Sequence, residues 1–239
     1  MISIQNITIL VPLFNEEHSI TRLIERLDKL VAQSAEQIHI LFVDDGSIDN
    51  TPVLLEKNIE GKTNYSALFL SRNFGHAPAL TAGLHEAAHS QTDAVFIIDG
   101  DLQDPPELLP SFLAKMKEGY DVVYGVRKNR KEGIVKRLCY LIYYRLQHRF
   151  VNVHMPLDAG DFSLLSKRVV TLINRLPEES RYMRGLRSWV GFKQAGIPYE
   201  RDERMQGSSK YSPGAFIKLA FNGLFNFSEL PVRFIVTTV

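Results

Sequence analysis

The sequence has little of several features that would place it in other protein classes. Its only cysteine is Cys139, so no disulfide can form within the chain. It has no run of 18 or more apolar residues to suggest a membrane-spanning helix. It begins without a basic segment followed by a long apolar run, so we expect no signal peptide. These absences predict a protein that works in the cytoplasm or at the cytoplasmic face of a membrane.

Two common enzyme classes are also disfavoured. No G-x-G-x-x-G follows an expected strand, which counts against a dinucleotide oxidoreductase. Gly61-Lys62-Thr63 resembles the end of a P-loop, but Glu56 stands where that loop needs its first glycine. The formal net charge of +1 gives no argument for a nucleic-acid partner, and we expect none.

The first half of the chain alternates strand and helix patterns. Continuous apolar runs predict buried strands at 7–14, 38–43, 65–70, 94–98 and 121–126. Helical periodicity predicts helices at 16–30 and 78–88, a further helix that begins after Asp49 as its N-cap, and another opened by Pro105 and Pro106. Repeated strand–helix units predict an α/β fold, with a mostly parallel sheet and helices on both faces. Ligands bind such sheets beyond the carboxyl ends of the strands.

The second half is less regular. It predicts a long amphipathic helix at 131–153, a short strand at 162–165, a helix at 167–176 and a strand at 194–199. The segments 213–227 and 230–239 are apolar and aromatic but too short to span a bilayer. They fit amphipathic segments in the membrane interface, and burial in the domain core is the competing interpretation.

Asp99, Asp101 and Gln103 follow a buried strand and are spaced two residues apart. In extended chain such residues point to the same side, so three oxygen ligands can meet at one hard cation. A cation such as Mg²⁺ or Mn²⁺ can neutralise a diphosphate leaving group. The alternative is that these are solvated loop residues or helix caps. The buried strand before them favours the metal.

Two further polar groups follow strands. Asp44 and Asp45 can accept hydrogen bonds from a base edge or a ribose hydroxyl, or they can belong to a turn with its cap. Arg72 can hold a phosphate or pair with one of the acids. The segment 204–211 combines two cations with glycine and serine, which suits closure over phosphates or a mobile surface loop.

These motifs, taken in order, resemble the family 2 glycosyltransferases. Within that family they resemble the polyprenyl-phosphate group, which includes dolichyl-phosphate mannose synthases and undecaprenyl-phosphate glucosyltransferases. The segments that carry the resemblance are 11–16, 44–51, 71–75, 99–107, 158–162, 184–186 and 204–211. The family often has alanine where this chain has Gly100, a change that we expect to affect backbone freedom more than chemistry.

The resemblance implies a GT-A catalytic domain at 1–212, followed by a juxtamembrane segment at 213–239. Relatives usually continue into transmembrane helices after this point. The implied site comprises nucleotide-binding residues Pro12, Asn15, Glu16, Asp44, Asp45, Arg72 and Gly100; metal ligands Asp99, Asp101 and Gln103; phosphate and acceptor residues Arg127, Arg204, Ser209 and Lys210; and catalytic residues Asp101, Asp158, Asp161 and Arg204.

The implied activity is inverting transfer of a hexose-type sugar from a nucleotide diphosphate sugar, with a UDP-sugar favoured, to a polyprenyl phosphate such as undecaprenyl phosphate. The expected partners are the donor, the lipid and a membrane surface, and a homo-oligomer is left open. A soluble or oligosaccharide acceptor is one alternative, and a non-catalytic nucleotide-sugar-binding domain is another. The Gln-x-x-Arg-Trp motif of processive family members is absent, which disfavours a polymerase.

Overall fold

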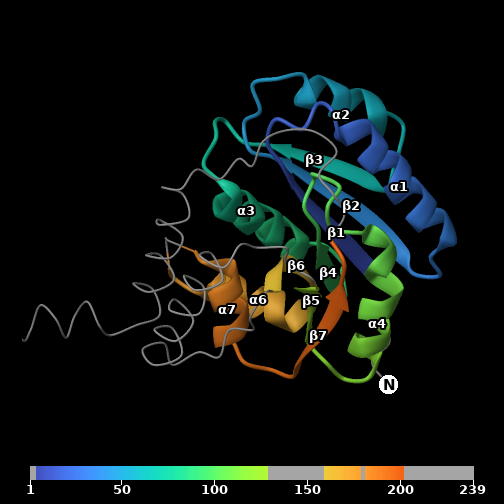
Figure 1. Cartoon of the computed structure of the whole chain (residues 1–239). Coiled ribbons are helices and arrows are strands. Elements are labelled where there is room, and N and C mark those ends of the chain that lie inside the picture. Colours follow the sequence, from blue (N-terminus) through green and yellow to red (C-terminus); the bar gives the residue numbers. More distant parts are fainter. Residues whose placement is uncertain (1–3, 129–158, 179–180, 202–239) are drawn as a thin grey trace, which may run out of the picture.

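A seven-stranded sheet forms the centre of the molecule (Figure 1). The computed structural model describes residues 4–128, 159–178 and 181–201. The strands are β1 (Asn6–Leu13), β2 (Gln37–Asp44), β3 (Tyr65–Phe69), β4 (Ala94–Ile97), β5 (Val122–Arg127), β6 (Ala159–Ser166) and β7 (Gln194–Tyr199). The helices are α1 (Ile20–Gln33), α2 (Thr51–Ile59), α3 (His76–His89), α4 (Leu109–Lys117), α6 (Lys167–Arg175) and α7 (Met183–Trp189), with a 3-10 turn η1 (Pro106–Leu108).

The strand order is β3-β2-β1-β4-β6-β5-β7. β1 pairs in parallel with β2 and β4, β2 with β3, and β5 with β7. Only β6 runs antiparallel to its neighbours, β4 and β5. The mostly parallel sheet predicted from the sequence is therefore confirmed. Because β6 is reversed, its first residues lie at the same edge as the last residues of the other strands.

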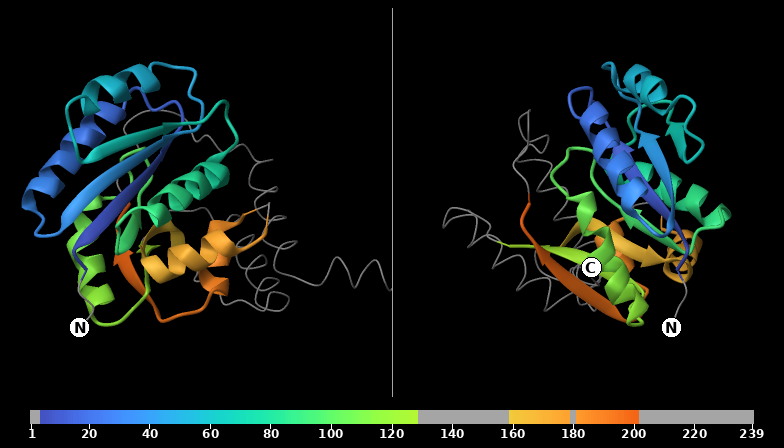
Figure 2. Two further views of the ribbon diagram at one scale, coloured as in Figure 1. Left: turned by 180° about the vertical axis from the view of Figure 1, so that it is seen from behind. Right: turned by 90° about the vertical axis from the view of Figure 1, so that its right-hand side faces the viewer.

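Helices cover both faces of the sheet (Figure 2). In β1, Ile7, Ile9 and Val11 join the apolar cluster that contains side chains of α1, α2 and α4. Leu10 joins the other cluster, which contains side chains of α3, α6 and α7. Successive side chains of a strand point to opposite faces, and both faces are buried, so β1 has to be apolar at almost every position.

Helix α1 begins four residues later than its periodicity predicts. Residues 16–19 form a turn in which the Ser19 amide donates to the Glu16 carbonyl (3.0 Å) and the Ser19 hydroxyl donates to Glu16 Oε2 (2.8 Å). Apolar residues at 3.6-residue spacing, from Ile20 to Leu30, then face the sheet. Glu16 therefore lies in the loop beyond β1, where a ligand can be reached.

Four aromatic rings connect the core to the strand-end edge. Phe96, Phe112, Phe162 and Tyr199 pack at tilted or edge-to-face angles, with ring centroids 5.0–5.3 Å apart. A Cβ atom at Gly125 would come within 2.5 Å of the Phe162 ring and 2.7 Å of the Tyr199 ring. Glycine is therefore required in β5 for this packing, which fixes the position of the Tyr199 hydroxyl.

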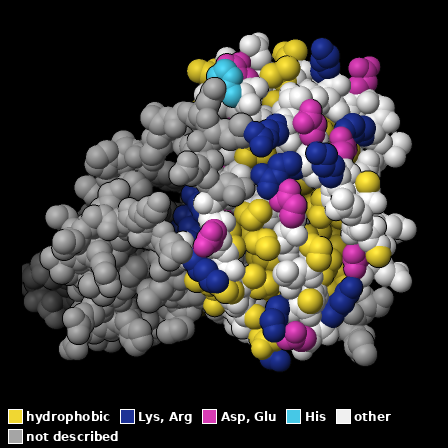
Figure 3. Space-filling model, turned by 45° about the vertical axis from the view of Figure 1, so that its right-hand side comes forward, with side chains coloured by type: hydrophobic (Ala, Val, Ile, Leu, Met, Phe, Trp, Pro, Cys, Tyr) yellow, Lys and Arg dark blue, Asp and Glu magenta, His cyan; other side chains and the backbone are white. Residues whose placement is uncertain are grey.

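Ion pairs connect η1 and α4 to neighbouring elements. On the face in Figure 3, Lys and Arg side chains lie among Asp and Glu side chains around exposed apolar atoms. Arg26 in α1 donates to both carboxylate oxygens of Glu107 in η1, at 2.8 and 2.6 Å. Lys117 in α4 lies 2.8 Å from Glu36, just before β2. Both pairs hold η1 and α4 against the first half of the sheet.

Three of the elements predicted in the second half are present in the structure. The strand expected at 162–165 is the longer β6, the helix expected at 167–176 is α6, and the strand at 194–199 is β7. Helix α7 was not predicted. The helix expected at 131–153 and the segment 213–239 lie outside the described residues. Among the residues that the structure describes, no helix has the length and apolarity to cross a bilayer.

Candidate active site

The carboxyl ends of the strands bring most of the predicted site residues to one edge of the sheet. β1, β2, β4 and β7 each end there, and β6 begins there. Acidic side chains from these segments lie close to arginines that are distant in the sequence. This edge is the candidate active site.

The loop after β4 carries a carboxylate cluster of Asp99, Asp101 and Asp104. Arg201, just after β7, lies among them. Its Nη2 is 3.3 Å from Asp99 Oδ2 and 3.8 Å from Asp101 Oδ2, and its Nε is 3.5 Å from Asp104 Oδ1. Asp99 and Asp101 therefore present oxygens to a single cationic nitrogen. Sequence reasoning did not find Arg201, which belongs to none of the motifs.

Asp104 is the buried member of the carboxylate cluster, only 1% exposed. Tyr199 donates its hydroxyl to Asp104 Oδ1 (2.6 Å), and Arg127 Nε donates to the Tyr199 oxygen (3.4 Å). Burial and the negative charge of Asp99 raise the pKa of Asp104 to about 6, against the opposing effect of Arg201. Arg127, predicted to face an acceptor phosphate, is thus linked to the carboxylate cluster through Tyr199.

Asp161, the third residue of β6, is held between two cationic side chains. Its carboxylate accepts from Arg184 Nε and Nη2 (both 3.3 Å) and lies 3.4 Å from His76 Nε2. His76 also lies 4.0 Å from Asp99 Oδ1, which links Asp161 to the carboxylate cluster. The antiparallel direction of β6 is what places Asp161 beside the end of β4.

This arrangement shifts two pKa values in opposite directions. Burial raises the pKa of Asp161, but the positive charges of Arg184 and His76 outweigh burial and hold the pKa well below its usual range. Burial lowers the pKa of His76, but Asp161 and Asp99 outweigh it and raise the pKa to about 9. At neutral pH Asp161 is therefore a carboxylate and His76 an imidazolium.

Asp44 and Asp45, at the end of β2, have different roles. Asp45 accepts from the backbone amides of Phe74 and Gly75 with its two oxygens (both 2.8 Å), so it fixes the loop before α3. Asp44 uses Oδ2 to accept from the Ser47 amide (3.0 Å), while its buried Oδ1 has no hydrogen-bond partner in the described part of the chain. Asp44 therefore keeps an acceptor oxygen available for a ligand, whereas both oxygens of Asp45 are bonded to the backbone.

The loop after β1 is tied to the loop after β2. Asn15 adopts a positive φ of 52°, which asparagine tolerates better than most residues. Its backbone amide donates to Ser47 Oγ (2.8 Å), and its Oδ1 accepts from the Ile48 amide (2.9 Å). The Glu16 amide donates to Thr51 Oγ1 (2.8 Å). These bonds join the two predicted nucleotide-binding segments into one surface.

The predicted cap at Asp49 is wrong by one residue, since Asn50 is the N-cap of α2 and its side chain makes no capping bond. Asp49 nevertheless accepts from the amide of Thr51 (3.0 Å) and from that of Glu17 (3.2 Å). It joins the β1 loop to the start of α2, which is a structural role.

The backbones of Gly46 and Arg72 lie in close contact. Gly46 has a φ of +63°, and a Cβ atom there would come 2.7 Å from Arg72 Cα and closer still to its carbonyl carbon. The Arg72 guanidinium lies 3.9 Å from the centre of the Phe74 ring and donates to the Asn73 carbonyl (3.0 Å). Among described residues Arg72 forms no ion pair with an acid, so that alternative is not realised.

An alanine in place of Gly100 would have to displace the end of the Leu13 side chain. A Cβ atom there would come 2.5 Å from Leu13 Cδ2 and 3.2 Å from the Pro12 carbonyl oxygen, and the φ of Gly100 is not positive. Glycine is therefore not needed here for a left-handed backbone, and its visible effect in the structure is steric. Gly100 lets the β4 loop lie directly against Pro12 at the end of β1.

The carboxylate cluster offers hard oxygen ligands to a divalent ion. Asp101 Oδ1 accepts from the Gln103 amide (3.1 Å), and Oδ2 of Asp101 and Oδ2 of Asp99 both lie near Arg201 Nη2. Within the described ranges, no three His, Cys, Asp or Glu side chains form a metal-binding group. Two carboxylates whose oxygens lie around one cationic group fit Mg²⁺ or Mn²⁺, whose remaining positions water, Gln103 or a diphosphate would fill.

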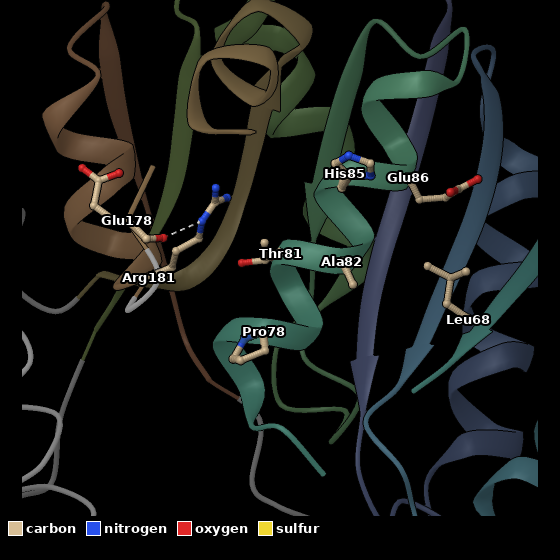
Figure 4. Close-up of a pocket in the computed structure, with 8 residues that line it drawn as sticks. All are labelled: Leu68, Pro78, Thr81, Ala82, His85, Glu86, Glu178 and Arg181. Atoms are coloured by element: carbon tan, nitrogen blue, oxygen red, sulfur yellow. Dashed lines mark hydrogen bonds between the residues drawn. The ribbon is translucent and has the colours of Figure 1, made fainter. Parts of the chain in front are cut away.

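Four predicted residues, Asp158, Arg204, Ser209 and Lys210, lie outside the described residues. An open cavity of about 570 Å³ lies elsewhere, beside α3 (Figure 4). His85 and Thr81 line it from α3, and Arg181, which donates to the Glu178 carbonyl (3.2 Å), lines it from the opposite side. This cavity contains none of the predicted site residues.

The fold matches solved nucleotide-sugar enzymes. One is glucosyl-3-phosphoglycerate synthase of Mycobacterium tuberculosis, solved with Mn²⁺, UDP-glucose and phosphoglyceric acid (TM-score 0.59, 18% identity, covering 91% of this chain and 76% of that one). Another is S. aureus TarS with UDP-GlcNAc (TM-score 0.56, 18% identity, covering 90% of this chain and 64% of that one). The protein therefore has the GT-A fold.

The sequence comparisons give the family. The model of glycosyl transferase family 2 matches residues 8–172, and the chain belongs to that family. It is 40% identical to the uncharacterized glycosyltransferase YkcC of Bacillus subtilis (strain 168), covering 95% of this chain and 69% of the relative. It is 35% identical to the prophage bactoprenol glucosyl transferase homolog of Escherichia coli (strain K12), covering 95% of this chain and 74% of the relative.

Proposed function

We propose that this glycosyltransferase moves a hexose-type sugar, with inversion, from a nucleotide diphosphate sugar to a polyprenyl phosphate such as undecaprenyl phosphate. The observation that carries the proposal is the convergence of Asp99 and Asp101 on one cationic position, beside the ionised Asp161. Relatives named bactoprenol glucosyl transferases, 35–36% identical over 95% of the chain, support the lipid acceptor.

The donor occupies the edge formed by the β1 and β2 loops. Asp44 Oδ1 accepts a hydrogen bond from the base or ribose, and Pro12, Asn15, Glu16 and Gly100 form the adjoining wall. Neighbours solved with UDP-glucose and UDP-GlcNAc favour a UDP-sugar. Asp45 supports this surface indirectly, because it fixes the loop before α3.

Asp99, Asp101 and Gln103 hold the divalent ion. When bound, Mg²⁺ or Mn²⁺ neutralises charge that develops on the leaving diphosphate. In the transfer, a phosphate oxygen of the lipid forms the new bond to the anomeric carbon, and the bond from that carbon to the diphosphate oxygen breaks. A phosphate monoester has a second pKa of about 6, so the acceptor is largely dianionic at neutral pH and needs no strong base.

Asp161 and Arg127 orient the reactants. Asp161 is kept ionised by Arg184 and His76, so it can only accept hydrogen bonds, which suits the hydroxyls of the transferred sugar. Arg127 attracts the lipid phosphate. A Cβ atom at Gly160 would lie 3.0 Å from Arg127 Nη2, so a larger residue there would crowd the Arg127 guanidinium.

The remaining assignments extend the same reaction. Arg204, Ser209 and Lys210 bind the phosphates of donor and acceptor, and Asp158 faces the sugar. The segment 213–239 lies against the membrane, and the reaction takes place at the cytoplasmic face of the plasma membrane, where nucleotide sugars are available. These parts rest on the sequence alone.

A donor panel tests the proposal. UDP- and GDP-sugars labelled in the sugar are incubated with the protein and Mn²⁺, with undecaprenyl phosphate or a soluble sugar as acceptor. Labelled lipid product is counted in the organic phase, and labelled soluble product is separated from the donor in the aqueous phase. We expect lipid-linked product from a UDP-hexose. Transfer to the soluble sugar alone would show that the acceptor is a soluble sugar and not a polyprenyl phosphate. Donor binding without transfer or hydrolysis would favour a non-catalytic domain.

A further inference from the structure

Arg201 has no role in the reaction proposed above. Its Nη2 lies between Asp99 Oδ2 (3.3 Å) and Asp101 Oδ2 (3.8 Å), and its Nε faces Asp104 Oδ1 (3.5 Å). One guanidinium thus lies within 4 Å of three carboxylates from a single loop. Asp99 and Asp101 are the same two side chains that hold the divalent ion in the proposed function.

A second arginine in the protein shows how different this contact is. Arg26 binds Glu107 through two short hydrogen bonds, at 2.8 and 2.6 Å, in the two-pronged geometry that arginine and carboxylate favour. Among the described residues, Arg201 Nη2 donates one long hydrogen bond, to Asp99 Oδ2 (3.3 Å), and Arg201 Nε has no hydrogen-bond partner. Arg201 is therefore a shared counter-charge, placed centrally and not bonded firmly to one carboxylate.

Arg201 and a metal ion need the same space. Mg²⁺ would draw the Asp99 and Asp101 oxygens to about 2.1 Å, into the region where Nη2 now lies. Two cations only a few ångströms apart also repel each other, and the acids lie in partly buried surroundings where this repulsion is poorly screened. The side chain of Arg201 is 26% exposed, so it has access to solvent when it leaves.

We propose that Arg201 is an internal counter-cation of the carboxylate cluster, which competes with the divalent ion for Asp99 and Asp101. The inference rests on the proposed function, because that function places the ion between these two acids. Arg201 keeps the three carboxylates together when no ion is bound. Arg201 lies three residues before Arg204, which is the first residue of the basic segment assigned to the phosphates.

The test is Mn²⁺ binding to the full chain without donor, measured by electron paramagnetic resonance of free Mn²⁺ and by calorimetry. Arg201→Gln removes the competing charge, so we expect its dissociation constant for Mn²⁺ to fall by on the order of 10-fold. Mn²⁺ should then also raise the melting temperature of Arg201→Gln more than that of wild type. Arg201→Met is a second variant that removes the charge and keeps an apolar stem.

Two controls separate competition from a general charge effect. Arg201→Lys keeps the charge and should bind Mn²⁺ within about 3-fold of wild type. Arg168→Gln removes an arginine that pairs with Asp121 at the opposite edge of the sheet, and it should leave Mn²⁺ affinity unchanged. Equal or weaker Mn²⁺ binding in both Arg201→Gln and Arg201→Met would overturn the inference.

The outcome also distinguishes this inference from the proposed function. If Asp101→Ala abolishes Mn²⁺ binding but loss of Arg201 does not tighten it, the metal site stands and the competition does not. If neither wild type nor Arg201→Gln binds Mn²⁺ through Asp101, the metal assignment itself falls, and the competition falls with it.

Discussion

Replacing Asp161 with asparagine removes the charge that joins β6 to Arg184 and His76. The wild-type carboxylate is 13% exposed and lies 3.3–3.4 Å from nitrogens of both partners. Breaking a fully buried pair costs about 3–5 kcal/mol, and breaking a surface pair costs less than about 1 kcal/mol. Because Arg184 and His76 are 31% and 37% exposed, we expect an intermediate loss of about 2 kcal/mol.

Thermal unfolding in EDTA measures this loss. For a chain of this length, about 2 kcal/mol lowers the melting temperature by roughly 4–8 °C. A double-mutant cycle with Arg184→Gln isolates the pair, and we expect a coupling energy of about 1 kcal/mol or more. Additive losses, with coupling below about 0.3 kcal/mol, would refute the claim that Arg184 holds Asp161 in place.

The effect should depend on pH in two directions. The lowered pKa of Asp161 gives stability that is present above the ordinary Asp pKa of about 4 and is lost as the pH falls below it. The raised pKa of His76 gives stability that is complete below about 6.5 and is lost as the pH rises through about 9. The difference between wild type and Asp161→Asn should peak between these limits, and a difference that stays constant from pH 5 to 10 would exclude His76.

Three other substitutions test the walls of the site. Gly46→Ala, which places a Cβ against the Arg72 backbone, should lower the free energy of unfolding by about 2 kcal/mol or more in urea titrations, and a neutral result would contradict the close crossing. Gly100→Ala should also destabilise the protein, and adding Leu13→Val should recover part of the loss; no recovery would mean that Leu13 is not the obstacle. Asp44→Asn should weaken UDP binding about 10-fold with little change in melting temperature, and unchanged affinity would remove Asp44 from the nucleotide site.

The sheet and its functional edge could be predicted from the sequence because buried parallel strands have a strong local signal. β1, β2 and β4 are nearly uninterrupted apolar runs that end at polar residues, so the positions of Asp44 and Asp99 follow from the strand boundaries. The bounds of β7 were also predicted correctly.

Contacts that depend on distant pairing could not be predicted. The sequence indicated a short strand within β6, but its insertion between β4 and β5, which brings Asp161 beside Asp99, is set by long-range pairing. Arg201 and His76 acquire their roles only through that arrangement. Helix α7 is seven residues long and includes Gly185, so its helical pattern is too short to recognise.

Asp45 shows why a motif does not give the role of each member. Asp44 and Asp45 are adjacent, and both were assigned to the nucleotide. Adjacent side chains at a strand end point in different directions, and Asp45 is turned toward the amides of Phe74 and Gly75. The fold of the loop before α3 therefore determines that Asp45 is the carboxylate bonded to the backbone amides.

The most direct test of the account is the metal dependence of transfer in wild type and in Asp101→Ala, followed as labelled sugar on undecaprenyl phosphate together with released nucleoside diphosphate. The account predicts equal amounts of both products in wild type with Mn²⁺ or Mg²⁺, and loss of both in EDTA and in a folded Asp101→Ala protein. Transfer by Asp101→Ala at near wild-type rate, or by wild type in excess EDTA, would contradict the assignment of the carboxylate cluster as the metal site.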